Sequence, residues 1–125
     1  GVIKSKPLNK IQFNKEIKSK IEELRLDISQ YARATKYVHR KQFLEAMVYF
    51  HKWIMAPLVE LLRIRYMPLT HDMHLVHISS HLPKKVVAKL EELYKIQSLN
   101  HIKVNTKKAL KMFGSTYEYL MKTKN

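Results

Sequence analysis

The chain of 125 residues lacks cysteine and has only two glycines and two aspartates. The lack of cysteine excludes a disulfide scaffold, thiolate zinc sites, iron–sulfur clusters and a cysteine nucleophile. The glycines, Gly1 and Gly114, are too far apart for the glycine-rich loop of a Rossmann or P-loop phosphate site. The aspartates, Asp27 and Asp72, are also far apart, so the chain contains no Asp-x-Asp metal motif.

Long apolar runs are also lacking. Charge-free stretches such as 53–59 and 73–83 fall well short of the roughly twenty apolar residues that a membrane span needs. We therefore expect no membrane partner and a cytoplasmic location. No signal peptide is visible. The chain begins with Gly rather than Met, and we expect it to be a piece of a longer protein.

Positive charge is what the sequence has in excess. Lys and Arg number 24 against 10 Asp and Glu, which gives a formal net charge of +14. The excess lies in residues 1–36 and 83–125, whereas residues 37–82 are nearly balanced. Such a field concentrates anions such as nucleotides, RNA or acidic lipid. Because lysine supplies most of the charge and is spread along the chain, solvated helix faces explain the composition equally well.

The spacing of apolar residues predicts an all-α bundle of four to five helices. Ile17, Ile21, Leu24, Ile28 and Tyr31 recur at steps of four and three, which is typical of one helix face. This predicts a helix over about 12–36, and similar patterns predict helices over about 37–66, 71–81, 83–96 and 100–122. No segment alternates with period two, as a strand would. We expect residues 11–125 to form one domain and residues 1–10 to be a linker or a remnant strand of a missing domain.

The stretch 37–66 is expected to be the long central helix. It is apolar on every side around residues 53–59, as expected for an element in the middle of a bundle. Pro57 lacks an amide donor and clashes with the preceding turn, which predicts a kink or a new helix start. In the last helix, Gly114 interrupts the pattern and indicates close packing against a neighbour.

Four histidines are the first candidate site. His71, His74, His77 and His81 follow at steps of three, three and four, which would place them on one side of a helix. Imidazoles at such spacing can share a metal ion. The alternative is a polar helix face, because no nearby glutamate completes a ligand set.

The pair Arg65 and His71 is the second candidate. Their spacing is similar to the signature of HEPN ribonuclease domains, in which the arginine holds phosphate and the histidine moves a proton. Pro68 breaks the helix between them, however, and the same spacing occurs at Arg33 and His39. The pattern is therefore common in a chain so rich in basic residues.

The third candidate lies at the end of the central helix. Glu60 and Arg63 are one turn apart and can pair, which would be an ordinary ion pair at a helix surface. The functional alternative is that Arg63 or Arg65 projects toward an anionic ligand where the helix gives way to a loop. No serine elbow accompanies Asp27 or Asp72, so no Ser-His-Asp arrangement is predicted.

Three segments carry a family resemblance. They are the run Phe50–Pro68 (FHKWIMAPLVELLRIRYMP), the triplet Thr70-His71-Asp72, and the run Leu82–Tyr94 (LPKKVVAKLEELY). Together they resemble the C-terminal helical domain of DNA-polymerase-β-like nucleotidyltransferases of the small, antibiotic-nucleotidyltransferase-like kind. The resemblance covers about residues 37–115.

The resemblance implies a substrate-binding module that is not active alone. In such enzymes the catalytic domain carries Gly-Ser followed by Asp-x-Asp, which holds magnesium and the nucleotide phosphates. Here Gly114-Ser115 is followed by no aspartate, so the catalytic half is missing. The nucleoside triphosphate and Mg²⁺ are then expected on a polymerase-β-like domain of the same parent chain, and this chain is expected to bind no cofactor itself.

The same resemblance implies a site for a small-molecule or nucleic-acid acceptor and is compatible with a homodimer. Its expected acceptor-binding residues are Glu60, Arg63, Arg65, His71 and Asp72. Two other classes stay open from the residues alone. One is a HEPN-type, metal-independent ribonuclease or toxin component, and the other is a basic helical domain that binds nucleic acid through its lysines.

Overall fold

The computed structural model describes residues 9–123, which are helical apart from short connections and include no strand. The helices are α1 (Lys10–Ile28), α2 (Ala32–His39), α3 (Phe43–Phe50), α4 (Ala56–Tyr66), α5 (Ile78–His81), α6 (Lys84–Tyr94) and α7 (Leu99–Thr123). A 3₁₀ turn joins α1 to α2 and a π-helical turn joins α3 to α4, so the described chain forms five rods. The predicted all-α bundle of four to five helices is confirmed. The linker or strand predicted at 1–10 falls largely outside the described residues.

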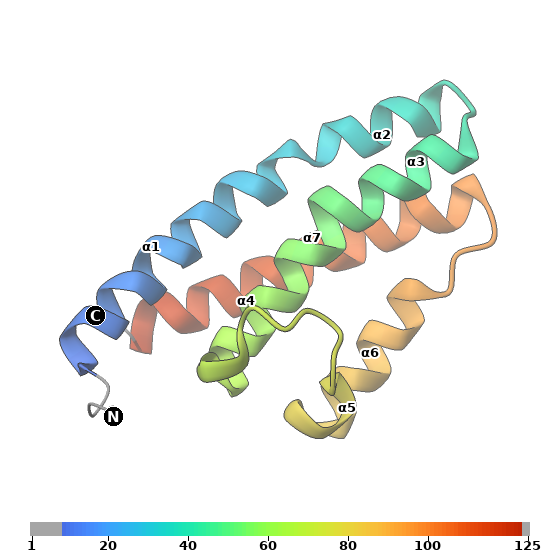
Figure 1. Cartoon of the computed structure of the whole chain (residues 1–125). Helices are drawn as coiled ribbons and strands as arrows, with labels where there is room; N and C mark the ends of the chain where they lie inside the picture. Colours follow the sequence, from blue (N-terminus) through green and yellow to red (C-terminus); the bar gives the residue numbers. More distant parts are fainter. Residues whose placement is uncertain (1–8, 124–125) are drawn as a thin grey trace.

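α4 lies at the centre of the bundle. It packs against α1 and α7, while α3 packs against α2 and α7. Figure 1 shows the α1–α2 rod, the α3–α4 rod and α7 lying along one another, with α5 and α6 to one side. The apolar residues of α4 are buried on all its faces, as predicted for a central element: Leu58, Val59, Leu61, Leu62 and Ile64. No helix among residues 9–123 combines the length and the apolar character needed to cross a membrane.

The first rod follows the predicted stripe until its 3₁₀ turn. Asn9 caps α1, because its side chain accepts a hydrogen bond of 3.0 Å from the Gln12 amide. The stripe residues from Ile17 to Ile28 are buried. Tyr31, the last predicted member, is instead 41% exposed, because the 3₁₀ turn Ser29–Tyr31 changes the helical register.

The second rod begins six residues later than predicted. Residues 37–39 complete α2, and the chain then reverses through Lys41, which has a positive φ of 59°. The Gln42 amide donates to the Tyr37 oxygen at 2.9 Å and closes this turn. Tyr37 stacks on Tyr49 across the hairpin, with ring centroids 5.2 Å apart. No glycine or proline marks the reversal, which is why the apolar pattern alone did not place it.

The predicted proline kink in the central helix is not confirmed. Pro57 is the second residue of α4. The irregularity lies just before it, in the π-helical turn His51–Met55. There the Ala56 amide donates to the His51 oxygen, five residues back, instead of four.

The last two helices, α6 and α7, agree with their predicted ranges. Ser98 caps α7, because its hydroxyl accepts a 3.1 Å hydrogen bond from the His101 amide. The close packing predicted at Gly114 is wrong. A Cβ built on Gly114 would have no neighbouring atom within 4 Å, so this glycine faces open space.

Candidate functional site

Arg63 of α4 is buried, with no exposed surface. Its Nε donates to the backbone oxygen of His74 and its Nη2 to that of Val76, both at 2.6 Å. Its Nη1 donates to the hydroxyl of Thr70 at 2.9 Å and contacts Nδ1 of His81 at 2.8 Å. Because a guanidinium only donates, Nδ1 of His81 is the acceptor and the imidazole proton lies on Nε2. Burial lowers the pKa of Arg63, and the charge of the nearby Asp72 opposes that change.

These bonds replace the helix predicted over 71–81. Only Ile78–His81 is helical there, and residues before it form turns in which His74 and His77 have positive φ values of 51° and 58°. Left-handed residues interrupt a right-handed helix, and Arg63 takes up carbonyls that helix bonds would otherwise use. The predicted histidine stripe is therefore wrong. Within residues 9–123, no three His, Cys, Asp or Glu side chains come together as metal ligands.

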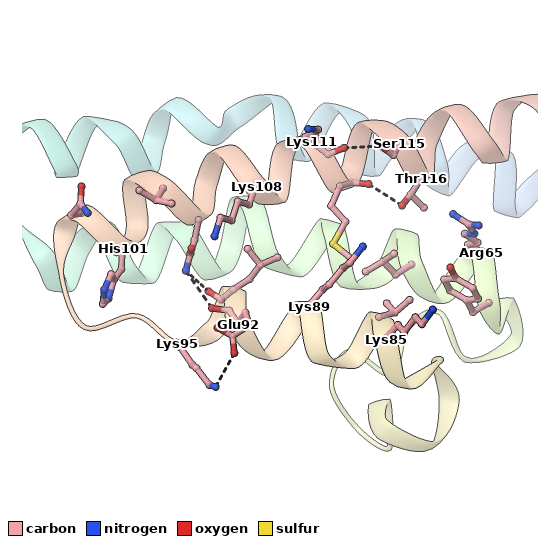
Figure 2. A pocket seen from close by; sticks show the side chains of 18 residues that line it. Arg65, Lys85, Lys89, Glu92, Lys95, His101, Lys108, Lys111, Ser115 and Thr116 are labelled. Carbon is pink, nitrogen blue, oxygen red and sulfur yellow. Dashed lines mark hydrogen bonds and ion pairs between the residues drawn. The ribbon is translucent and has the colours of Figure 1, made fainter.

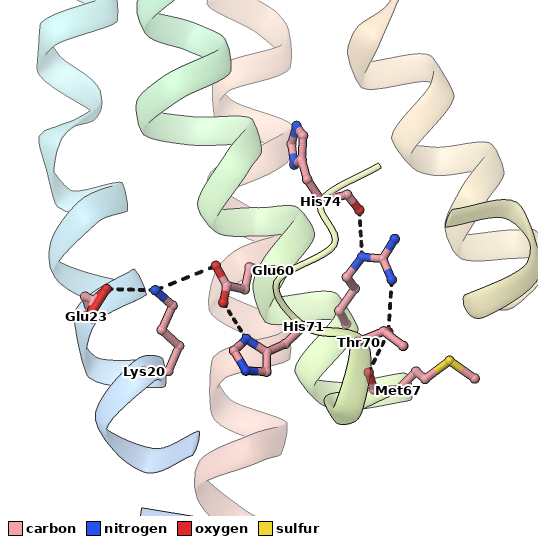
Figure 3. A network of polar contacts seen from close by, with 8 residues as sticks. Lys20, Glu23, Glu60, Met67, Thr70, His71 and His74 are labelled. Atoms are coloured by element: carbon pink, nitrogen blue, oxygen red, sulfur yellow. Dashed lines mark hydrogen bonds and ion pairs between the residues drawn. The ribbon is translucent and has the colours of Figure 1, made fainter. Parts of the chain in front are cut away.

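Glu60 of α4 and His71 of the connection that follows it form a second polar pair. Nδ1 of His71 lies 2.6 Å from Oε2 of Glu60, and Nζ of Lys20 lies 3.9 Å from Oε1 (Figure 3). Lys20 also pairs with Glu23 at 2.8 Å, and that hydrogen bond raises the pKa of Lys20, with Glu60 adding to the effect. The predicted pairing of Glu60 with Arg63 is wrong, because the arginine turns toward the 67–82 connection.

An aromatic cluster lies beside the π-helical turn. His51 stacks on Tyr94 of α6 with ring centroids 5.4 Å apart. Burial lowers the pKa of His51, and His74 nearby lowers it further. Burial also raises the pKa of Tyr94 to about 12. The hydroxyl of Tyr94 and Nε1 of Trp53 are buried without a hydrogen-bond partner. Periodicity gave no sign of this cluster, because it needs the π-helical turn and the end of α6 to meet in space.

A groove of about 830 Å³ runs between α6 and α7 and reaches the end of α4 (Figure 2). Its floor is apolar and its walls carry most of its polar side chains. The floor residues are Leu62, Val86, Leu93, Val104 and Met112. Clefts with an apolar lining and a few placed polar groups are the usual form of a ligand site.

The groove walls are strongly basic. Unpaired cations come from three helices: Arg65 of α4, Lys85 and Lys89 of α6, and Lys108 and Lys111 of α7. None of these five forms an ion pair with a carboxylate in the described part of the chain. The acidic residue of the lining, Glu92, pairs with Lys95 at 2.9 Å. The groove therefore presents uncompensated positive charge to a ligand.

Arg65 is held in place at one end of the groove. Its guanidinium carbon lies 3.9 Å from the ring centroid of Tyr119 and 4.9 Å from that of Tyr66. Such cation–π contacts fix the planar group without neutralising it, so its hydrogen-bond donors stay available.

A buried amide joins the two helices that form the groove. Nδ2 of Asn105 donates to the backbone oxygen of Leu93 at 3.1 Å and approaches that of Glu92 at 3.5 Å. Asn105 is 8% exposed, and this tie joins the last turn of α6 to α7. Arg65 lies at one end of the groove and His101, in the first turn of α7, at the other (Figure 2).

The five residues predicted as an acceptor site have different surroundings. Arg65 lines the groove, whereas Arg63 is buried behind it as the anchor of the 67–82 connection. Glu60 and His71 contact each other beside α1, and Asp72 is exposed. The groove lysines were missed because sequence shows their helical spacing but not that α6 and α7 face each other.

The pair proposed for a ribonuclease is also separated by its contacts. Arg65 lies over Tyr66 and Tyr119, whereas His71 pairs with Glu60. No hydrogen bond or ion pair joins Arg65 to His71 within 9–123.

Comparison with known proteins gives no relative of this chain. No protein-family model, no curated protein and no solved structure matches it.

Proposed function

We propose that this chain is the helical substrate-binding module of a nucleotidyltransferase and that it holds an anionic acceptor in the groove between α6 and α7. The observation that carries the proposal is the set of five unpaired cations around an apolar floor. The resemblance of residues 37–115 to the helical domain of such enzymes supports it.

In this proposal the groove binds and orients, and the chemistry takes place elsewhere. The cations hold the negative groups of the acceptor, and the floor covers its apolar part. The nucleoside triphosphate and Mg²⁺ bind a separate polymerase-β-like domain. The sequence has no Asp-x-Asp motif, and the described residues bring no acidic cluster together to hold the metal.

Arg65 takes the leading role in this site among the residues predicted from sequence. It lines the groove and is oriented by two tyrosine rings. Arg63 acts indirectly, because it fixes the connection that leads into α6 and so positions Lys85. Glu60 and His71 are proposed as part of the surface that meets the catalytic domain.

The first test separates binding from chemistry. The purified chain, incubated with ATP and Mg²⁺, should release no pyrophosphate. Inorganic triphosphate should bind the chain, and the Arg65→Gln substitution should lower the affinity for it. Pyrophosphate release by the chain alone, at a rate that follows its concentration, would overturn the proposal. A parent gene that encodes no Gly-Ser and Asp-x-Asp upstream of Gly1 would do the same.

A ribonuclease is the alternative that a simple assay can decide. A metal-free cleavage assay compares the chain with its Arg65→Ala and His71→Ala variants. Since the two side chains have separate partners, we expect no cleavage by any of the three proteins. Cleavage that both substitutions abolish would favour the ribonuclease over the binding module.

A further inference from the structure

The cations of the groove extend over a long distance. Lys85 and Lys89 are four residues apart on α6, which is about 6 Å along the helix axis. Lys108 and Tyr119 are eleven residues apart on α7, about 16 Å, and Arg65 lies over the Tyr119 ring. The row of positive charge from Lys108 to Arg65 is therefore much longer than one phosphate group.

This length distinguishes between anionic ligands. The phosphates of a mononucleotide are directly linked to one another and span a short distance. They can contact the cations at one end of the row, but the remaining cations stay unpaired. A nucleic-acid strand carries a charge at every nucleotide and can contact all of them, with about 3.4 Å of axis per phosphate in a B-form strand. The spacing favours an extended polyanion.

The apolar floor distinguishes a single strand from a duplex. Leu62, Val104 and Met112 lie between the two basic walls. A duplex hides the faces of its bases and would leave this floor uncovered, whereas an unpaired strand has base and sugar surfaces to place there. Arg65 offers guanidinium donors at the groove end, and Tyr66, which is 36% exposed, lies beside it.

We propose that the groove between α6 and α7 holds a single-stranded nucleic acid, with its phosphates along the two basic walls and its bases over the apolar floor. The inference rests on the proposed function and names its acceptor class. It is a binding step only, and the groove residues break no bond.

The test measures the fluorescence anisotropy of labelled single-stranded RNA and DNA oligonucleotides with the whole chain. Five phosphate contacts on a single strand give a slope of log K against log salt of about −3.5. A fourfold rise in salt should therefore weaken binding about 100-fold. Similar values for RNA and DNA identify the backbone as the common ligand, and a preference for RNA identifies the 2′-hydroxyl as a further contact.

Matched variants separate the groove from the overall charge. The groove variant carries Lys89→Gln and Lys108→Gln. The control carries Lys84→Gln and Lys103→Gln, which remove the same charge from exposed positions of the same two helices outside the groove. The groove variant should lose about tenfold in affinity, and its slope should change by about 1.4, whereas the control should change affinity less than about threefold. Circular dichroism of both variants shows that the fold is kept.

Each failure has its own meaning. Equal weakening by the groove and control variants would overturn the groove as the site. ATP or inorganic triphosphate could compete as strongly as an unlabelled oligonucleotide at equal phosphate concentration. That result would overturn the proposed single-stranded ligand, but an anionic acceptor would still fit the groove. Tighter binding of a duplex than of a single strand would also overturn the proposed single-stranded ligand. If neither triphosphate nor any oligonucleotide binds, the proposed function fails as well.

Discussion

Arg63 holds the backbone of His74, a residue eleven positions further along the chain, through a hydrogen bond of 2.6 Å from its Nε. A buried side chain of α4 thus determines the path of a segment that has little regular structure of its own. Two carbonyls, a hydroxyl and an imidazole depend on this guanidinium.

Replacing Arg63 should therefore destabilise the protein strongly. Arg63→Met keeps much of the volume but leaves the carbonyls of His74 and Val76 without their donor, and we expect a loss of about 2–4 kcal/mol in the free energy of unfolding. Urea denaturation measures the loss, and hydrogen exchange should show faster exchange at residues 70–81. Arg65→Met, on the same helix but partly exposed, is the control and should lose less than about 1 kcal/mol. Equal losses in the two variants would contradict the anchoring role of Arg63.

Gly114→Ala should stabilise the protein. The glycine lies inside α7 with a negative φ, and an added methyl group would meet no atom within 4 Å. Alanine has the better helix propensity, so the free energy of unfolding should rise by about 0.5–1 kcal/mol, with a higher Tm by thermal denaturation. A lower Tm would mean that this face of α7 packs against something after all.

Stability should decrease at mildly acidic pH because of His51. Burial holds its pKa below the ordinary value of about 6.5, so below that pH the unfolded chain takes up a proton that the folded protein does not. The contribution of His51 is fully kept above about pH 6.5 and falls as the pH drops toward the lowered pKa. Urea denaturation at several pH values between these limits measures how steeply the free energy of unfolding falls as the pH is lowered.

The control for this pH dependence is His51→Phe, which keeps a ring to stack on Tyr94 and cannot be protonated. Its stability should vary less with pH over the same range than that of the unaltered chain. An unchanged slope would assign the effect to other histidines, of which His74 is the first to examine because its pKa is also lowered by burial.

The contact between α1 and α7 gives a spectroscopic prediction. The hydroxyl of Tyr117 donates to Oε2 of Glu22 at 2.9 Å, and this bond, with a further one from Arg25, lowers the pKa of Glu22. In Tyr117→Phe the pKa of Glu22 should rise toward its ordinary value, as measured by carboxyl NMR titration. The Glu22 carboxylate is exposed and phenylalanine keeps the ring of Tyr117, so the Tm should hardly change. Arg25→Gln should also raise the pKa of Glu22, because it removes a hydrogen bond and a positive charge.

Local signals made most of the helices predictable. The stripe from Ile17 to Ile28 and the cap at Ser98 act within a few residues, so sequence spacing is enough to place α1 and α7. The turns at 71–77 were not predictable in the same way, because their geometry depends on a donor from α4. An amphipathic pattern in that segment favoured a helix, and the buried Arg63 opposed it.

The candidate site was predictable only in part, for a related reason. Arg65 was named because it is basic and lies at a helix end. Lys89 and Lys108 are nineteen positions apart, and the packing of α6 on α7, with the tie between Asn105 and Leu93, brings them to one groove. The basic composition was visible from the start, but its arrangement around an apolar floor depends on three helices packing together.

The first turn of α1 and the last turn of α7 emerge at the same pole of the molecule (Figure 1). Arg65, over the ring of Tyr119, lies near that pole, while the end of the groove at His101, in the first turn of α7, points away from it. Any polypeptide fused ahead of α1 or behind α7 would therefore begin near the end of the groove at which Arg65 lies. A domain fused at either end would thus need only a short linker to reach a ligand that extends from this end of the groove.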